Sequence, residues 1–78
     1  MLNENNLRMI RTFYGLNQRE LAEKVGVSQS YITHVEIGSR NISDNLRSSI
    51  IEALGLTEQK VEQIAEYEAA RERIAGVK

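Results

Sequence analysis

The 78-residue chain contains no cysteine, no proline and no tryptophan, and only one histidine. Without cysteine it forms neither disulfide bonds nor thiolate metal sites, and His34 has no second histidine beside which to bind a metal. No apolar run approaches the roughly 20 residues that cross a membrane. The chain does not open with a basic region followed by an apolar segment. We therefore expect a cytoplasmic protein without signal peptide, membrane span, metal or other cofactor.

Apolar residues make up 41% of the chain, which is enough for one hydrophobic core. A domain of this size is marginally stable unless its helices pack well or it pairs with a second chain. The β-branched residues occur singly at helical spacing rather than in alternating runs, which argues against strands. No repeat or linker interrupts the chain. The pattern predicts a single all-α domain over residues 1–78.

Capping residues and glycines divide the chain into five expected helices. Asn17 with Glu20 three residues later is a capping-box pattern at a helix start. Three more helix starts have hydroxyl side chains as expected N-caps: Ser28, Ser43 and Thr57. Three helix ends have glycines that tolerate left-handed backbone: Gly15, Gly26 and Gly55. The expected helices span about residues 4–14, 17–26, 28–37, 43–54 and 58–75.

The second and third helices carry the most specific pattern, in the sequence QRELAEKVGVSQSYITHVEI of residues 18–37. Apolar side chains form one stripe on each helix: Leu21, Ala22 and Val25 on the first, Ile32 and Val35 on the second. The outward face of the later helix instead displays hydrogen-bonding side chains: Gln29, Ser30, Thr33 and His34. A small domain that presents such groups on a well-defined helix pair is expected to read DNA.

The formal net charge of −1 argues against this interpretation, because nucleic-acid-binding domains are generally basic. The charge is unevenly distributed, however. Residues 1–42 hold five basic and four acidic side chains, whereas residues 43–78 hold five basic and seven acidic ones. The acid excess thus lies in the C-terminal half, and the first half can still form a local basic face.

The segment LNQRELAEKVGVSQSYITHVEIGSRNIS, residues 16–43, resembles the helix-turn-helix of the phage repressor and Cro superfamily, the XRE family. The family needs a small residue where the two helices cross, which is Ala22 here, and Gly26 in the turn. The resemblance covers about residues 5–56. It implies a compact five-helix, lambda-repressor-like DNA-binding domain, with residues 1–56 as the repressor-like core and 57–78 as an extended C-terminal helix.

The same resemblance implies roles for single residues on double-stranded DNA. A recognition helix over residues 28–37 would enter the major groove, which is about 12 Å wide. The expected base-reading residues are Gln29, Ser30, Thr33 and His34. Gln18 would hold a phosphate at the start of its helix, where free amides favour anions. The other residues expected to contact the phosphate backbone are Asn17, Arg19, Tyr31, Arg40, Asn41 and Ser43.

Arg11 and Glu36 resemble a pair that bridges the first and third helices in members of this family. Its expected role is to brace the recognition helix. We expect the pair to be half-exposed, in which case it would stabilise the fold by only about 0–1 kcal/mol.

The last helix carries more apolar surface than so small a domain is expected to cover. Its apolar residues suggest a dimerisation element: Val61, Ile64, Tyr67, Ala70 and Ile74. A ligand pocket is a less favoured interpretation of this stripe, and no small-molecule ligand is evident.

These features predict a sequence-specific transcriptional regulator, most simply a phage or mobile-element repressor that binds its operator as a homodimer. A restriction–modification controller protein would have a similar size. The acidic C-terminal half keeps another class open, a protein-interaction module such as an antitoxin or antirepressor partner. No nucleophile motif or phosphate-cradling glycine loop appears, so we expect binding rather than catalysis.

Overall fold

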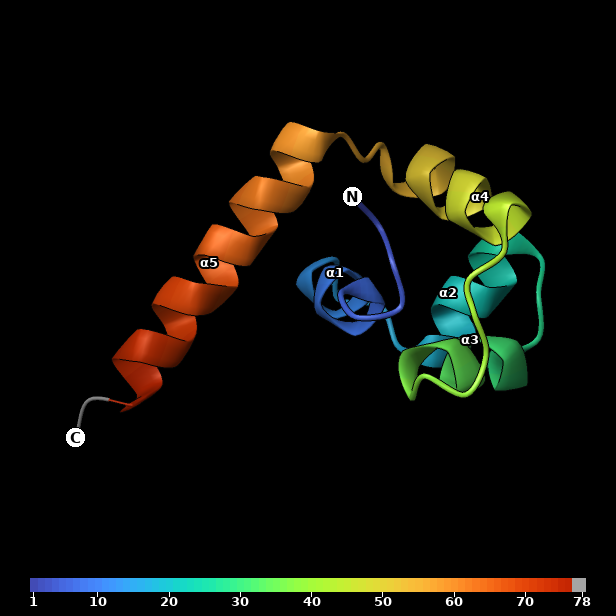
Figure 1. The fold of residues 1–78 in the computed structure, drawn as a ribbon, viewed down its shortest axis with the longest axis horizontal. Coiled ribbons are helices and arrows are strands. Elements are labelled where there is room, and N and C mark those ends of the chain that lie inside the picture. Colours follow the sequence, from blue (N-terminus) through green and yellow to red (C-terminus); the bar gives the residue numbers. More distant parts are fainter. Residues whose placement is uncertain (77–78) are drawn as a thin grey trace.

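The computed structural model describes residues 1–76, which form five helices and no strand (Figure 1). The predicted all-α fold is confirmed. Residues 77 and 78, the end of the range expected for the C-terminal helix, lie outside the described residues. The helices are α1 (Leu7–Phe13), α2 (Gln18–Val25), α3 (Gln29–Glu36), α4 (Asp44–Leu54) and α5 (Glu58–Gly76).

Every predicted N-cap is present. Asn17 Oδ1 accepts from the amide of Glu20 at 2.7 Å, and Glu20 Oε1 accepts from the amide of Asn17 at 2.8 Å. This reciprocal pair satisfies two backbone donors that the first turn of α2 leaves without a helical partner. At each of the three later helices a hydroxyl oxygen accepts one hydrogen bond from the amide three residues on: Ser28, Ser43 and Thr57.

The turn between α2 and α3 depends on the backbone freedom of one glycine. Gly26 has φ 74° and ψ 33°, in the left-handed region that other residues rarely adopt. A Cβ atom there would meet no atom within 4 Å, so the requirement comes from conformation and not from crowding. The amide of Val27 then donates to Ala22 O at 3.0 Å, which closes the end of α2.

Helix α1 begins at Leu7, three residues after the predicted start at Glu4. The early prediction is wrong because asparagine side chains compete for the backbone amides. Asn3 Oδ1 accepts from the amides of Asn5 and Asn6, and Asn6 Oδ1 accepts from the amide of Asn3 at 2.8 Å. These bonds hold a non-helical turn in front of α1.

The N-terminal segment instead packs against the edge of the core. Leu2 is buried with 2% of its surface exposed. The Glu4 carboxylate accepts from the amide of Ile42 at 2.7 Å, and Arg47 Nε donates to Leu2 O at 3.0 Å. Two segments far apart in the sequence are thereby joined at the edge of the core.

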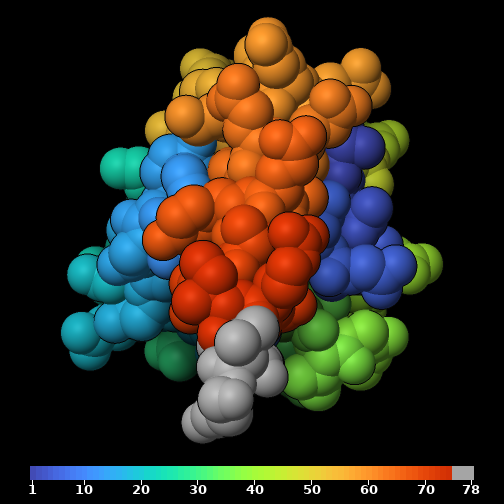
Figure 2. Space-filling view, turned by 90° about the vertical axis from the view of Figure 1, so that its left-hand side faces the viewer, coloured from blue at the N-terminus to red at the C-terminus, as the bar shows by residue number. Residues whose placement is uncertain are grey.

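The core extends beyond residue 56 into the first half of α5. Val61 and Ile64 are 8% and 1% exposed, and they belong to the same cluster as residues of α1, α2, α3 and α4. Figure 2 shows α5 lying across the N-terminal part of the chain. Two of the five residues expected at a dimer interface are therefore buried within their own chain.

The second half of α5 leaves large apolar side chains uncovered. Tyr67 is 57% exposed and Ile74 is 74% exposed. Although α5 has 19 residues, no helix within residues 1–76 is long and apolar enough for a membrane span. Figure 1 places α5 at one end of the long axis of the molecule and α2 and α3 toward the other end.

Replacement of Ile64 by alanine should lower the free energy of unfolding by about 2–5 kcal/mol, because it leaves a cavity in the core. The matched control is Ile37→Ala, since Ile37 is 68% exposed, and its effect should stay within about 0.5 kcal/mol. Urea denaturation followed by circular dichroism measures both. Equal effects of the two substitutions would show that α5 does not pack on the domain in solution.

Candidate nucleic-acid interface

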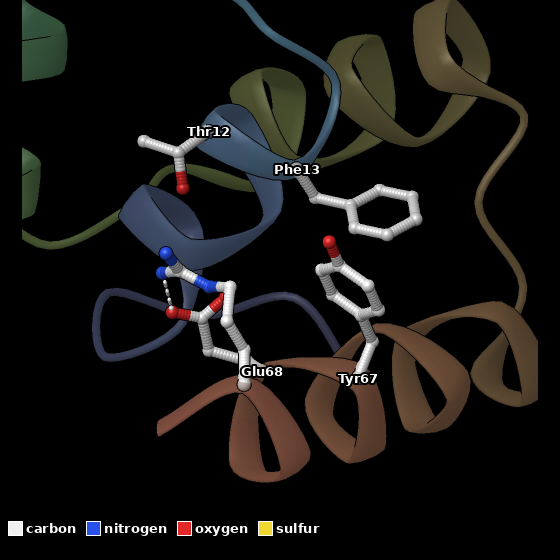
Figure 3. A pocket seen from close by; sticks show the side chains of 5 residues that line it. Thr12, Phe13, Tyr67 and Glu68 are labelled. Carbon is white, nitrogen blue, oxygen red and sulfur yellow. Dashed lines mark hydrogen bonds and ion pairs between the residues drawn. The ribbon is translucent and has the colours of Figure 1, made fainter. Parts of the chain in front are cut away.

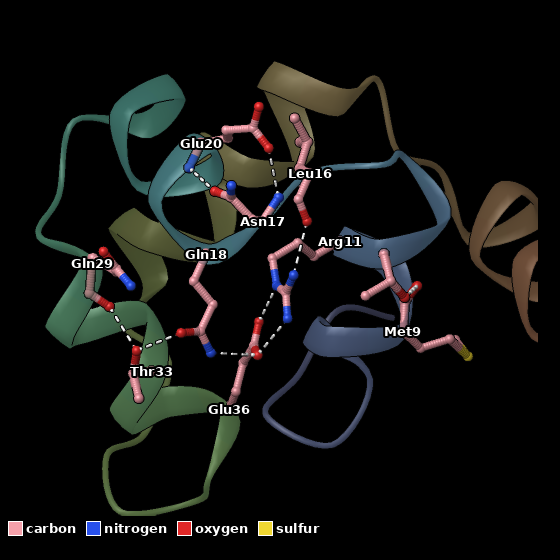
Figure 4. A network of polar contacts seen from close by, with 10 residues as sticks. Met9, Arg11, Leu16, Asn17, Gln18, Glu20, Gln29, Thr33 and Glu36 are labelled. Carbon is pink, nitrogen blue, oxygen red and sulfur yellow. Dashed lines mark hydrogen bonds and ion pairs between the residues drawn. The ribbon is translucent and has the colours of Figure 1, made fainter.

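The interior of the helix-turn-helix is organised by one arginine. Arg11 Nε and Nη2 donate to Glu36 Oε2 and Oε1 at 2.7 and 3.0 Å, a two-bonded ion pair between α1 and the end of α3 (Figure 4). Arg11 Nη1 also donates to Leu16 O at 2.8 Å. The guanidinium thus joins α1, α3 and the loop that leads into α2.

A chain of hydrogen bonds runs outward from this pair. Glu36 Oε1 accepts from Gln18 Nε2 at 3.0 Å, and Gln18 Oε1 accepts from Thr33 Oγ1 at 2.7 Å. Thr33 Oγ1 also lies 3.1 Å from Gln29 O (Figure 4). An amide nitrogen carries two hydrogens, so Gln18 keeps one N–H for a group outside the protein.

The Arg11–Glu36 pair is buried, and the expectation of a half-exposed pair is corrected. The Arg11 side chain is 9% exposed and that of Glu36 is 3% exposed. Burial opposes ionisation of Glu36, but hydrogen bonds from Arg11 and Gln18 together with the charge of Arg11 outweigh it. The pKa of Glu36 is therefore lowered from its ordinary value of 4.5.

The outward face of α3 presents three of the four predicted base-reading side chains to solvent: Gln29, Ser30 and His34. Thr33 is half-buried, and its hydroxyl hydrogen is used within the protein. The hydroxyl of Thr33 therefore has no hydrogen left to donate, and its methyl group and oxygen lone pairs remain for contact with a base.

The residues predicted to contact phosphates form two groups beside this face. The first lies at the start of α2, where Asn17, Gln18 and Arg19 line a polar hollow of about 340 Å³ together with Gln29. Arg19 is held only loosely, since its Nε lies 3.6 Å from Glu23 Oε1 and both side chains are 71% exposed. The free amides of the first turn of α2 favour an anion at this place.

The second group lies where the loop after α3 leads into α4. The Arg40 guanidinium lies over the Tyr31 ring, 5.2 Å from its centroid. Tyr31 Oη accepts from the amide of Ser43 at 3.3 Å. Asn41 is exposed in the same loop. The ring of Tyr31 therefore positions both the cation and the loop beside α3.

Sequence reasoning missed one polar residue of this surface, Ser39. Its Oγ lies 2.9 Å from His34 Nδ1, in the turn that follows α3. It missed the bond between Gln18 and Thr33 as well. Both contacts join residues that no capping or periodicity rule pairs, so the sequence carried no signal for them.

The arrangement can hold a polyanion on both sides of a helix face rich in hydrogen-bonding groups. Comparison with known proteins agrees with this arrangement, because a family model described as helix-turn-helix matches residues 7–61. Neither the comparison with curated proteins nor the comparison with solved structures gives a significant match.

Replacement of Glu36 by glutamine should lower the free energy of unfolding by about 3–5 kcal/mol, because it leaves the buried Arg11 without a counter-charge. The control Glu23→Gln removes the acidic partner of an exposed pair, so its effect should stay within about 0.5 kcal/mol. Chemical denaturation at neutral pH compares the two.

The pH dependence separates loss of the ion pair from general damage. Because the pKa of Glu36 is lowered in the folded state, its contribution is complete above the ordinary value of 4.5 and is lost as the pH falls further. The difference in stability between wild type and Glu36→Gln should therefore shrink below about pH 4.5. A difference that stays constant down to about pH 3 would contradict this role of the carboxylate.

Proposed function

This chain belongs to the XRE-type helix-turn-helix family of DNA-binding transcription regulators, and we propose that it binds one specific operator through the exposed face of α3. The observation that carries the proposal is the placement of Gln29, Ser30 and His34 between two groups of phosphate-binding candidates. A major groove about 12 Å wide admits one helix, with phosphates along both edges.

The proposed reading of bases follows from the donors and acceptors that each side chain offers. Gln29 can bond an adenine at N6 and N7, and Ser30 suits several bases. His34 can contact a purine, and Thr33 can offer its methyl group to thymine. Gln29 lies next to the hollow at the start of α2, so contact with a base and contact with the adjacent phosphate can form together.

The proposed phosphate contacts set the position of the protein on the duplex. Gln18 would donate its remaining N–H, and the two exposed arginines, Arg19 and Arg40, would supply charge. The remaining contacts would come from polar groups of the same two clusters: Asn17, Tyr31, Asn41 and Ser43. Such contacts carry no sequence information and make the affinity depend on salt.

We propose further that two copies bind two half-sites about 34 Å apart. The surface that supports this is formed by Tyr67, Ala70 and Ile74 on α5. Phe13 of α1, 39% exposed, packs edge-to-face on Tyr67 with ring centroids 5.6 Å apart (Figure 3). Single exposed apolar residues are common, but here Phe13 and Tyr67 together line a hollow of about 290 Å³.

A second copy fits this surface because its charges are self-complementary. Glu68 and Arg71 form a pair on the same side of α5, with Nη2 and Oε1 2.5 Å apart. When two identical helices meet about a twofold axis, a contact of one residue with a second residue of the other copy is matched by the reciprocal contact. Glu68 of one copy can then face Arg71 of the next, around the apolar centre.

In the proposed role, the protein acts in the cytoplasm of a bacterium or a phage-infected cell, as a repressor encoded by a phage or mobile element. Because the described residues form one small DNA-binding domain, the protein would regulate transcription by occupying the operator. The same fold could instead act as an interaction module, such as an antitoxin partner, and the acidic side chains of α5 motivate that second candidate.

Gln29→Ala and His34→Ala should each weaken binding to the promoter beside the protein's own gene by roughly five- to 150-fold, since each removes base contacts worth about 1–3 kcal/mol. Arg40→Gln should instead weaken binding to all sequences and reduce the slope of log affinity against log salt by about 1. Gel shifts over a salt series measure both effects.

The control is Ser48→Ala, because Ser48 is exposed on α4 and belongs neither to the proposed DNA contacts nor to the apolar stripe of α5. Circular dichroism checks that each variant folds. If folded wild-type protein binds no neighbouring promoter even at low salt, the interaction module becomes the better explanation.

Tyr67→Glu combined with Ile74→Glu should turn the dimer into a monomer, because four carboxylates would be buried between the two copies. The control is Ala69→Glu, which lies on the opposite side of α5 at 100° per residue. Sedimentation equilibrium at tens of micromolar compares the three proteins. A wild-type monomer under these conditions would refute the proposed dimer.

A further inference from the structure

The loop after α3 returns to contact the recognition helix at His34. Gly38, with φ 83°, turns the chain so that Ser39 follows immediately. Ser39 Oγ lies 2.9 Å from His34 Nδ1, and both side chains are exposed. One of the proposed base-reading side chains is thus hydrogen-bonded to a residue outside the helix.

The direction of this hydrogen bond decides which ring nitrogen of His34 carries the hydrogen. Ser39 Oγ has one hydrogen to donate, and it lies 3.2 Å from His34 O as well as 2.9 Å from Nδ1. His34 O already accepts from the amides of Ser39 and Arg40, at 3.0 and 3.2 Å. A carbonyl oxygen has two lone pairs, and both already have donors.

The hydroxyl of Ser39 therefore donates its hydrogen bond to His34 Nδ1. A neutral imidazole has one nitrogen that donates and one that accepts. With Nδ1 accepting from Ser39, the hydrogen of the ring lies on Nε2. Nε2, the ring nitrogen that does not contact Ser39, can then donate a hydrogen bond but cannot accept one.

We propose that Ser39 is a positioning residue that sets the base preference of His34 by holding the ring in its Nε2–H form. The proposal rests on the proposed function, because it concerns the partner that His34 would meet in the major groove. A donor at this point suits guanine, whose N7 and O6 both accept. It rejects cytosine, which offers only its amino donor there.

Nitrogen-15 NMR of the full chain tests the hydrogen position without DNA. At pH 8, where imidazole side chains are generally neutral, the single histidine should show a protonated Nε2 and an unprotonated Nδ1. Ser39→Ala should convert this pattern to an average of both forms, and Ser39→Thr should retain it. A wild-type ring with the hydrogen on Nδ1, or no change in Ser39→Ala, would overturn the proposal.

Selection of duplexes from a randomised library tests the consequence for recognition. Wild type should enrich guanine over cytosine at one position, and His34→Ala should lose that preference. Ser39→Ala should reduce the ratio about three- to tenfold, the effect of one hydrogen bond. Ser39→Thr should preserve the ratio, as should the control Ser48→Ala on α4.

These outcomes separate the two proposals. If wild type enriches no sequence at all, the proposed function fails, while the NMR result still decides the hydrogen position. If wild type enriches a sequence through His34 but Ser39→Ala selects guanine with the same ratio, the proposed function stands and the role of Ser39 is refuted. If Ser39 only held the loop after α3 in place, Ser39→Ala would change neither the hydrogen position on the His34 ring nor the selected base.

Discussion

The buried ion pair between Arg11 and Glu36 is the constraint on which the rest of the structure depends. Removing two charges from water costs several kcal/mol per ion, and the cost is offset only when the geometry satisfies their donors and acceptors. Arg11 meets this condition with three hydrogen bonds to Glu36 and Leu16 O, and Glu36 with an additional one from Gln18. An apolar pair of the same volume could stabilise the core equally well. It could not fix the direction of a polar side chain at the surface.

That direction is what connects the core to the interface. Gln18 is held at both ends of its amide, by Glu36 and by Thr33, so its remaining N–H has a fixed orientation before any ligand arrives. Side-chain ordering on binding costs about 0.5–1.5 kcal/mol for each flexible side chain. Much of that cost is met during folding at Gln18, and also at Arg40, which rests on the Tyr31 ring. Arg19 is held only by an exposed ion pair, so ordering its side chain on binding still has its full cost.

The features that could be predicted from the sequence are those set by neighbouring residues. The capping box of Asn17 and Glu20 and the left-handed Gly26 depend on a few residues of local chain, and both are present. The burial of Glu36 was missed, because the contacts that cover a charged pair come from separate helices. The stripe on α5 shows the same limit, since periodicity identifies an apolar face without saying what covers it. Val61 and Ile64 turned inward to the core, whereas Tyr67 and Ile74 remain exposed.

The net charge of −1 opposes binding of a polyanion, but the charges of the two signs are unevenly distributed over the molecule. Helix α5, which carries much of the acid excess, lies at one end of the 40 Å long axis of the molecule, and α2 and α3 lie toward the other end. At physiological ionic strength the interaction between exposed charges decays over about 8 Å. DNA at α3 would therefore sense the charges of α2 and of the loop after α3, Arg19 and Arg40 with Glu20 and Glu23, more than those of α5. With so few cations, one copy gains little affinity from phosphates. In the proposed dimer, a second set of contacts on the same duplex would raise the affinity without any new contact within one copy.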